Sequence, residues 1–315
     1  MKSSYITPAV TLFDASGRFD LDGQAALYEH LIQNHMDGIL VLGSIGEFFS
    51  LSLEEKRKLA SFAIHSIAHR CKTIIGTASM QDEEVILFSN ECIDAGADAV
   101  MIVPPYYFAL DEASVYRYFH RLAHEIRGPL YIYNFPARTG YSISIRTILD
   151  LAAECPNIIG VKDTVSDMSH TRDLIKLVKR LRPDFEVYSG FDDNLAHNAL
   201  CGGDGCIGGL SNVFPDICAA WVYALRSNDI IGIAKGQQII NELFDIYSIG
   251  PSFIPIIKEA ARLRGFISSV RCSFPFPDVT ETQREGIIKL LQSCADHDKL
   301  CFCQMKDGTK THQNS

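Results

Sequence analysis

Long hydrophobic runs and positive charge are both scarce in this chain of 315 residues. The longest apolar runs, such as Ala99 to Pro105, are far shorter than the roughly 20 residues that a transmembrane helix needs. Lysine and arginine number 29 against 38 aspartates and glutamates, so the formal net charge is −9, and no basic face is evident that would neutralise nucleic-acid phosphates. We therefore expect neither a membrane nor a nucleic-acid partner.

The chain also lacks the patterns of a secreted protein. Met1-Lys2-Ser3-Ser4 leads directly into a strand-like run, so no targeting segment is visible. Its 10 cysteines are scattered through a long sequence, mostly inside apolar runs, whereas disulfide frameworks belong to short secreted chains. The sequence predicts reduced thiols and a cytoplasmic protein.

No metal-ligand spacing stands out. Cys301 and Cys303 lie close together in a polar tail, but no second cysteine or histidine pair completes a zinc pattern. His65 and His69 are four residues apart, yet Ser66 occupies the position where a metalloprotease motif has glutamate. A solvated helix face explains the two histidines better, and we expect no metal site.

Short β-rich runs alternate with amphipathic stretches, a pattern typical of βαβ units. The runs cover Tyr5–Phe13, Gly38–Leu42, Thr73–Gly76, Ala99–Val103, Leu130–Asn134, Ile158–Lys162, Glu186–Ser189 and Cys206–Gly208. Most are continuously apolar, as are strands buried on both faces of a sheet. Eight such units close naturally into a barrel, so the sequence predicts an α/β protein with a (β/α)8 TIM barrel.

The pattern changes after Asn212, where helical periodicity continues without further strands. The helical segments cover Ile217–Leu225, Ile230–Ile246, Phe253–Arg264 and Glu281–Ser293. We expect a barrel with the active site over residues 1–226 and a C-terminal helical extension over 227–295. The polar tail, 296–315, has too few apolar residues to pack and is expected to be disordered.

The active site of a β/α barrel lies where the strands end, and Lys162 ends the apolar run that begins at Ile158. Its amine is therefore expected in the confined mouth of the barrel. Loss of hydration there favours a neutral amine, a nucleophile that condenses with a keto acid to a Schiff base. The alternative is an ordinary strand-end lysine that pairs with Asp163 and faces water.

Two other strand ends offer partners for this chemistry. Gly43-Ser44-Ile45-Gly46 has small residues that let backbone N–H groups and the Ser44 hydroxyl hold a carboxylate. Tyr133 stands three residues before Pro136, and its phenol can pass a proton to or from the reacting carbon. Each has a plain alternative: a common Gly-Ser turn, and a core tyrosine bonded to the backbone.

Together, the segments Gly43–Glu47, Tyr133–Pro136 and Gly160–Asp163 resemble the loop, turn and strand motifs of the dihydrodipicolinate synthase and N-acetylneuraminate lyase family. These are class I, pyruvate-dependent enzymes. The motifs occur in order and at family-like spacing, and the resemblance extends over most of the chain. It implies a barrel with a helical extension, usually a homotetramer built as a dimer of dimers. It also implies catalysis through a covalent lysine Schiff base, with neither metal nor cofactor.

The resemblance also assigns roles to single residues. Lys162 matches the Schiff-base lysine, Tyr133 the proton-relay tyrosine and Ser44 the first hydroxyl of the loop. Tyr107 matches the tyrosine that a neighbouring subunit lends to the relay. These four residues are the predicted catalytic set.

Other positions bear on the substrate. Ile45 replaces the second loop hydroxyl, as in loops of 2-keto-3-deoxy sugar acid aldolases, whereas Arg138 matches the position that holds the carboxylate of aspartate semialdehyde in dihydrodipicolinate synthases. Asp192 matches an acidic residue that meets substrate hydroxyls in sugar-acid lyases; alternatively, it or Asp193 caps a helix.

The last predicted binding residues follow the eighth run. Ile207 and Gly208 match a backbone wall of the pyruvate site, and the adjacent Gly209 lacks a hydroxyl that some lyases place there.

The predicted activity is reversible aldol cleavage of a 2-keto-3-deoxy sugar acid, or a similar 4-hydroxy-2-keto acid, to pyruvate and an aldehyde. The alternative within the class is condensation of pyruvate with aspartate semialdehyde, the first committed step of lysine synthesis in this family. An alternative outside enzyme chemistry is a non-catalytic relative that binds keto acids, although such a protein needs neither Lys162 nor Tyr133.

Overall fold

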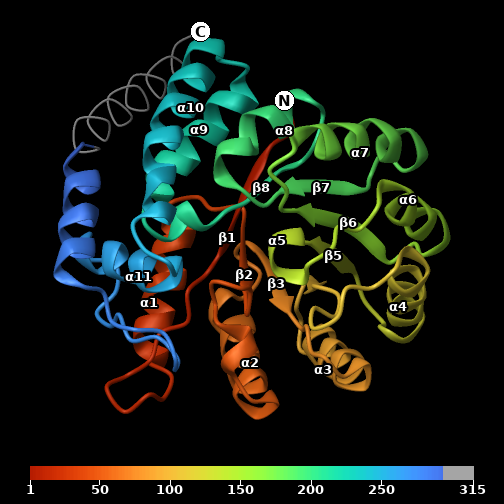
Figure 1. Ribbon diagram of the computed structural model, residues 1–315, viewed down its shortest axis with the longest axis horizontal. Coiled ribbons are helices and arrows are strands. Elements are labelled where there is room, and N and C mark those ends of the chain that lie inside the picture. The colour runs from red at the N-terminus through yellow and green to blue at the C-terminus, as the bar shows by residue number, and fades with distance from the viewer. Residues whose placement is uncertain (294–315) are drawn as a thin grey trace, which may run out of the picture.

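The computed structural model describes residues 1–293 and contains a closed barrel of parallel strands in the order β1 to β8, each hydrogen-bonded to the next and β8 to β1 (Figure 1). The strands are β1 (Ser4–Pro8), β2 (Gly38–Val41), β3 (Lys72–Gly76), β4 (Ala99–Ile102), β5 (Leu130–Asn134), β6 (Ile158–Asp163), β7 (Glu186–Ser189) and β8 (Gly205–Ile207). The predicted (β/α)8 barrel is confirmed.

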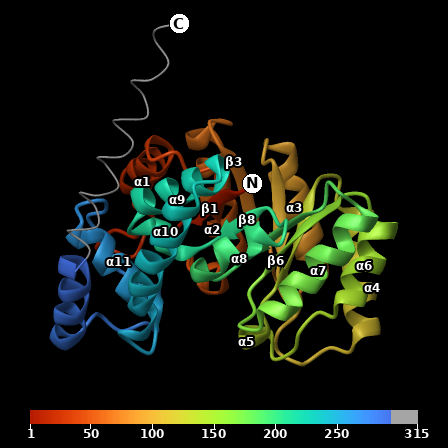
Figure 2. The ribbon, with the colours of Figure 1, turned by 90° about the horizontal axis from the view of Figure 1, so that it is seen from above.

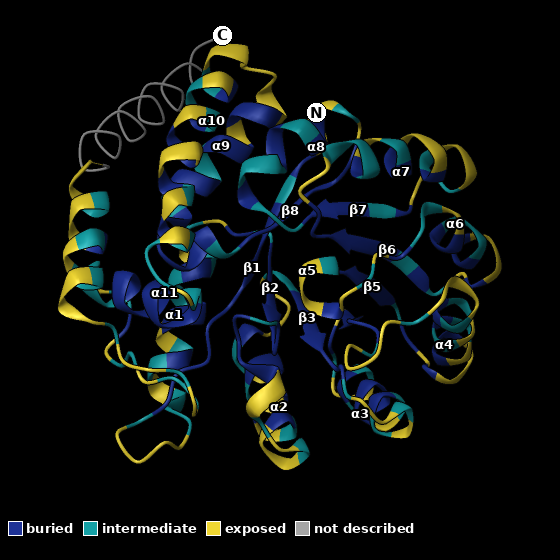
Figure 3. Ribbon diagram, in the orientation of Figure 1, coloured by how far each residue is buried: buried dark blue, intermediate teal, exposed yellow. Residues whose placement is uncertain are grey.

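Helices cover the outside of the barrel, with their apolar sides buried against it and their outer sides exposed (Figure 3). They are α1 (Leu21–Gln33), α2 (Leu53–Ile67), α3 (Asp82–Asp94), α4 (Glu112–Glu125), α6 (Ile145–Glu154), α7 (Met168–Leu181) and α8 (Leu195–Leu200). The short helix α5 (Pro136–Thr139) belongs instead to the loop that follows β5. Local sequence sets their ends: α2 begins at a capping box, in which Ser52 and Glu55 each bond the other's backbone N–H.

The first strand is shorter than the predicted run. β1 ends at Pro8, whereas the apolar sequence continues to Phe13. Side chains take over the backbone hydrogen bonds of this continuation. Asn212 donates to Pro8 O at 2.9 Å and accepts from Val10 N at 3.0 Å, and Gln24 accepts from Leu12 N at 2.9 Å. The run is therefore buried without being a strand, a distinction that hydrophobicity alone does not make.

Polar side chains fill the barrel at the amino ends of the strands. Lys72 of β3 donates to Glu186 of β7 at 2.9 Å and to Tyr131 of β5 at 3.0 Å. Because these strands are not neighbours in the sheet, the bonds cross the barrel interior. This cluster fills the barrel interior at the amino ends of the strands, so an open cavity is expected at the carboxyl ends.

The C-terminal helices gather on one side of the barrel, away from α4 and α6 (Figures 1 and 2). They are α9 (Pro215–Ser227), α10 (Ile230–Phe244), α11 (Phe253–Leu263) and a final helical segment at 281–293, and they agree with the four predicted segments. The proposed boundary at 226/227 falls at the end of α9. The predicted tail, 296–315, lies outside the described residues, and within 1–293 no helix has the length and apolarity to cross a membrane.

Candidate active site

A cavity of about 350 Å³ opens at the carboxyl ends of the strands. Its wall includes Pro8, Ser44, Tyr133, Lys162, Thr164, Asp192 and Ile207, which belong to or follow six of the strands, together with Phe244, Tyr247 and Phe253 from the C-terminal helices. We call this the inner cavity. An adjoining outer cavity of about 260 Å³ shares Ser44, Phe135, Arg138 and Phe253 with it and is mainly aromatic. The helical extension thus completes a site that the sequence analysis placed in the barrel alone.

Lys162 lies in the wall of the inner cavity, in register with Tyr133 of β5 and Tyr188 of β7. Its side chain is 5% exposed, and Nζ lies 4.3 Å from the centre of the Tyr133 ring. Among the residues that the structure describes, no carboxylate forms a salt bridge with Lys162. The lysine therefore meets the cavity as a buried amine, and the alternative of a water-facing Lys162–Asp163 pair is wrong.

Asp163 points to the opposite face of β6, as successive strand residues do. Its carboxylate accepts hydrogen bonds from Thr171 at 2.6 Å and from Asn134 at 2.8 Å, and it pairs with His170 at 3.0 Å. These partners fasten α7 and β5 to β6. Asp163 therefore holds β6, the strand that carries Lys162, in place and is not the ion-pair partner of the lysine.

Thr164 is a cavity residue that the sequence analysis missed. It stands two positions after Lys162 on the same face, and its buried Oγ1 has no hydrogen-bond partner among the described residues. A Cβ at Gly190 would lie 1.7 Å from this oxygen, so the glycine makes the space that the hydroxyl occupies. An orphaned hydroxyl in a cavity wall is suited to a ligand, and the i, i+2 spacing from Lys162 is the signal that would have found it.

The loop after β2 brings Ser44 into the walls of both cavities and buries Ile45 in the inner one. Glu47 ends the loop in a left-handed conformation, with φ of 59°. Its buried carboxylate accepts from Lys258 of α11 at 2.5 Å and from the Ser273 backbone N–H at 2.7 Å. The C-terminal extension thus anchors the loop that holds Ser44.

Asp192 lies in the cavity wall but is bonded to the protein. Its oxygens accept hydrogen bonds from Tyr5, from Tyr247 at 2.9 Å and from the Leu210 N–H at 3.0 Å. Burial raises the pKa of this carboxyl, and the three donors oppose that shift. The alternative in which Asp192 caps the following helix is wrong, since Asn194 is the residue that precedes α8 and the Asp192 carboxylate bonds Tyr5, Tyr247 and Leu210 instead. Asp192 instead orients Tyr247, whose ring lines the cavity.

The end of β8 and the loop after it form one wall of the inner cavity. Ile207 and Gly209 line the inner cavity, and Gly208 lies buried between them against Asp192. A Cβ at Gly209 would lie 2.7 Å from the Tyr247 hydroxyl and 3.3 Å from Ile45 Cδ1. A side chain at position 209 would therefore collide with Tyr247 and press against Ile45. Glycine at this position leaves room for both residues.

The other two predicted residues lie further out. Arg138 is exposed, lines both cavities and stacks over Phe135 with 5.7 Å between the guanidinium and the ring centre. Tyr107 does not line either cavity in the part of the chain described, and its side chain is 80% exposed beside Phe108. A single chain therefore does not bring Tyr107 to Lys162.

His65 and His69 line neither cavity. Helix α2 ends at Ile67, so His65 and His69 do not share a helix face, and His69 lies in a turn with φ of 57°. Cys301 and Cys303 lie outside the described residues. The cysteines within the described part of the chain are free thiols.

Known proteins share both the sequence and the fold. A protein of Escherichia coli (strain K12) named "Putative 2-dehydro-3-deoxy-D-gluconate aldolase YagE" is 36% identical, with 94% of this chain and 97% of that protein aligned. A 4-hydroxy-tetrahydrodipicolinate synthase of Kosmotoga olearia is 32% identical, over 93% of this chain and 97% of that one. The crystal structure of YagE with pyruvate superposes with a TM-score of 0.90, covering 92% of this chain and 98% of that one. Residues 1–294 match the sequence pattern described as the dihydrodipicolinate synthetase family, and the chain belongs to that family.

Proposed function

We propose that this protein is a class I lyase that cleaves a 2-keto-3-deoxy sugar acid, or a similar 4-hydroxy-2-keto acid, reversibly to pyruvate and an aldehyde. One observation carries the proposal: Lys162 is a buried lysine that faces a cavity beside Tyr133 and has no carboxylate partner within residues 1–293. A charged lysine in such a place is normally paired. A lysine that forms a covalent imine has a reason to lack a partner.

The reaction follows from this arrangement. The Lys162 amine attacks the C2 carbonyl of the keto acid, and loss of water gives an imine. When the imine is protonated, the C3–C4 bond breaks and its electron pair moves toward the imine nitrogen, giving an enamine. Tyr133 takes the proton of the C4 hydroxyl as the aldehyde forms, and returns a proton to C3. Hydrolysis of the resulting imine releases pyruvate and restores the amine. The imine is the electron sink, so no step needs a metal or a cofactor.

The remaining wall residues divide between the two ends of the substrate. We assign the pyruvate carboxylate to Ser44 and the backbone of its loop, beside the wall made by Ile207 and Gly209. The Thr164 hydroxyl offers a hydrogen bond to the substrate near the bond that breaks. The likeness to YagE over nearly the whole chain supports the sugar-acid substrate, and a hydroxylated chain matches a cavity that holds a spare hydroxyl.

Arg138 supports the second candidate function. Its exposed guanidinium, at the junction of the two cavities, suits the carboxylate of aspartate semialdehyde in a condensation with pyruvate. The substitution Arg138→Leu tests this. Crippled reaction with aspartate semialdehyde and near-normal reaction with glyceraldehyde would establish that role, whereas equal losses would make Arg138 a structural residue.

We also propose the setting of the enzyme. The free, mostly buried cysteines are consistent with the reducing cytoplasm. The exposed Tyr107 and Phe108 are consistent with a homo-oligomer, built as a dimer of dimers, in which a partner chain covers them.

Borohydride trapping tests the central step. Pyruvate and borohydride should add one reduced pyruvoyl unit to the chain, and digestion should place it on Lys162. The Lys162→Ala variant should show no adduct, whereas Lys56→Ala should trap normally, because Lys56 is a buried lysine outside both cavities. An adduct of equal yield in Lys162→Ala, or on another lysine, would overturn the assignment. A set of aldehydes incubated with pyruvate then identifies the product by mass spectrometry.

A further inference from the structure

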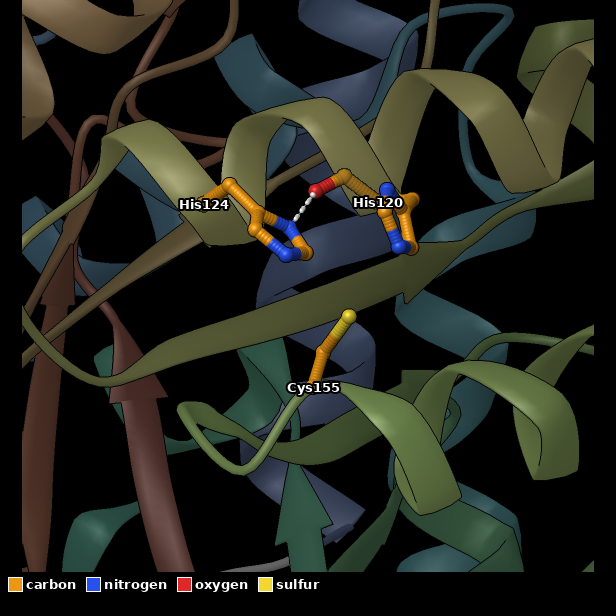
Figure 4. Close-up of side chains that lie close together, drawn as sticks. All are labelled: His120, His124 and Cys155. Carbon is orange, nitrogen blue, oxygen red and sulfur yellow. Dashed lines mark hydrogen bonds between the residues drawn. The ribbon is translucent and has the colours of Figure 1, made fainter.

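A group of soft ligands lies on the outside of the barrel, where helices α4 and α6 meet. His120 and His124 stand one turn apart on α4, and Cys155 is the residue that ends α6. One ring nitrogen of each histidine and the Cys155 sulfur all lie within 4.8 Å of one another. Figure 4 shows the thiol pointing toward the two imidazole rings. Within residues 1–293, no other trio of histidine, cysteine and carboxylate side chains is gathered so closely.

The ring of His124 is already oriented for coordination. His124 Nδ1 lies 2.8 Å from the His120 carbonyl oxygen, and because a carbonyl only accepts, Nδ1 carries the proton. The lone pair of His124 is then on Nε2. A histidine that ligates a metal typically donates its other ring nitrogen to such a carbonyl, which fixes both the ring and the tautomer. The two rings lie 4.3 Å apart and are tilted by 32°.

A carboxylate adds negative charge to the group. Glu154 Oε2 lies 4.0 Å from His120 Nε2 and accepts a hydrogen bond from Tyr116 at 2.5 Å. A Cys155 thiolate and the Glu154 carboxylate together carry two negative charges, which balance a divalent cation. The donor set of two imidazoles, a thiolate and a nearby carboxylate matches the ligands of zinc rather than those of calcium or magnesium.

The backbone that carries these residues is tied together without a metal. The Asn157 side chain donates to the carbonyls of Ala123 at 2.9 Å and Ile126 at 3.1 Å, which joins the segment after α6 to the end of α4. Tetrahedral zinc places neighbouring N and S ligands about 3.3 to 3.8 Å apart. The three donor atoms, which lie within 4.8 Å of one another, therefore need to approach by up to about 1 Å when the ion binds.

We propose that His120, His124 and Cys155 bind one Zn²⁺ ion per chain, with Glu154 beside it, and that the ion fastens α4 to α6. Cys155 precedes the first residue of β6, whereas Lys162 lies near the carboxyl end of that strand. The site is thus at the end of the barrel opposite the reacting lysine, where bound groups serve stability rather than catalysis. It is independent of the proposed aldolase activity.

Zinc binding at this site releases a proton. Only the thiolate form of a cysteine ligates a metal, so binding at Cys155 replaces the proton of the thiol. In calorimetry, zinc binding should therefore show a heat that depends on the ionisation enthalpy of the buffer. The excess corresponds to proton release and should disappear in Cys155→Ser.

The test uses the full chain without an affinity tag, stripped of metal with a chelator. We expect one Zn²⁺ per chain, with an affinity reduced at least ~10-fold by Cys155→Ser and by His124→Ala. Co²⁺ should give a thiolate-to-metal absorption band that both variants lose. Zinc should raise the melting temperature of the wild type but not that of the variants.

Two matched variants locate the binding. His65 bonds the carbonyl of Ser61 as His124 bonds that of His120, but it belongs to no such trio, so His65→Ala should bind zinc normally. The Cys301→Ser/Cys303→Ser variant lacks the two cysteines of the polar tail that were also considered as metal ligands, and it should bind zinc normally as well. Wild-type affinity in both Cys155→Ser and His124→Ala, or loss of binding only in the Cys301/Cys303 variant, would overturn the proposal.

Discussion

At the scale of single residues, the inner cavity contrasts two neighbours on β6. Asp163 is held by Asn134, His170 and Thr171, and its bonding capacity is used within the protein. Lys162, one position earlier, meets an open cavity without a carboxylate partner among the described residues. Alternation along the strand therefore separates a structural group from a reactive one.

Thr164 gives the sharpest prediction at this scale. Thr164→Val keeps the shape of the side chain and removes the hydroxyl, so kcat/KM for the hydroxylated keto acid should fall about 10-fold, the value of one hydrogen bond. Thr164→Ser should retain activity. Steady-state kinetics with the substrate identified from the aldehyde set makes the measurement.

Thr7 supplies the matched control for Thr164. Its hydroxyl is also buried and has no hydrogen-bond partner in the described part of the chain, but it lies outside both cavities, so Thr7→Val should leave kcat/KM unchanged. Gly190→Ala pushes a methyl group onto the Thr164 oxygen and should resemble Thr164→Val. Full activity in Thr164→Val would mean that this hydroxyl serves no substrate.

At the scale of secondary-structure elements, a buried ion pair joins the loop after β2 to helix α11. Glu47 and Lys258 are both fully buried, and Lys258 also donates to the Arg271 carbonyl at 2.8 Å. Glu47→Gln leaves a buried cation without its counter-ion, so the free energy of unfolding should fall by about 3–5 kcal/mol in urea titrations. The KM for pyruvate should rise as well, because Ser44 precedes Glu47 on the same loop.

A double variant separates loss of charge balance from loss of packing at this pair. Glu47→Gln/Lys258→Met removes both charges and should be more stable than Glu47→Gln alone. Glu125→Gln, which breaks an exposed pair with Arg121, should barely change stability. A double variant no more stable than the single one would show that hydrogen bonds, rather than charge, hold the loop.

Helix α7 gives the pH-dependent prediction. The hydrogen bond to Asp163 raises the pKa of His170, so the protonated ring stabilises the folded chain. This stabilisation is fully present below the unfolded pKa of about 6.5 and is lost as the pH rises through the higher folded pKa. Wild type should therefore exceed His170→Gln in unfolding free energy more at pH 6 than at pH 9. Parallel stability curves for the two proteins would contradict this.

How much of the fold and of the site the sequence predicts depends on how far apart in the sequence the contacting residues lie. The run that ends at Lys162 is a local pattern, and it correctly indicated the barrel and the position of the lysine in its mouth. Tyr247 and Phe253 enter the same cavity from the extension, and Lys258 pairs with Glu47 across 211 residues. No local sequence pattern predicts such contacts, because they form only when the C-terminal extension packs against the barrel.

The same limit explains two errors of interpretation. Burial of the run after Pro8 looked like a continuing strand, because the side chains of Asn212 and Gln24 that satisfy its backbone are remote in sequence. A helix cap, considered beside substrate binding for Asp192, is not formed; the sequence suggests it because capping residues and buried acceptors share one residue type. In both cases the sequence shows that a polar group needs a hydrogen-bond partner, and only the fold shows which residue is that partner.

At the scale of the whole molecule, the described chain leaves an aromatic surface uncovered. Tyr107 is 80% and Phe108 74% exposed, and they pack only edge to face against each other, 5.0 Å apart. Exposed aromatic pairs of this kind mark contacts with a partner. On the family resemblance, we expect a two-fold dimer that covers the pair and brings each Tyr107 to the site of the other chain.

Mixed oligomers test this shared site. Lys162→Ala and Tyr107→Phe should each be poor enzymes as homomers. When the two chains are combined, one site of a mixed dimer takes both substitutions and the other takes neither. Activity should therefore recover to at most about half that of wild type, by the reciprocity of a two-fold contact. Native mass spectrometry confirms that the mixed species forms.

The reverse combination distinguishes a shared site from one built within a single chain. Wild type is mixed with the double variant Lys162→Ala/Tyr107→Phe. If Tyr107 crosses to the partner, each site of the mixed dimer carries one lesion, and the mixed species should be poorly active. If Tyr107 acts in its own chain, the wild-type site stays intact and half the activity remains. Recovery in this second mixture together with none in the first would place Tyr107 in the site of its own subunit, and the exposed pair would then serve packing alone.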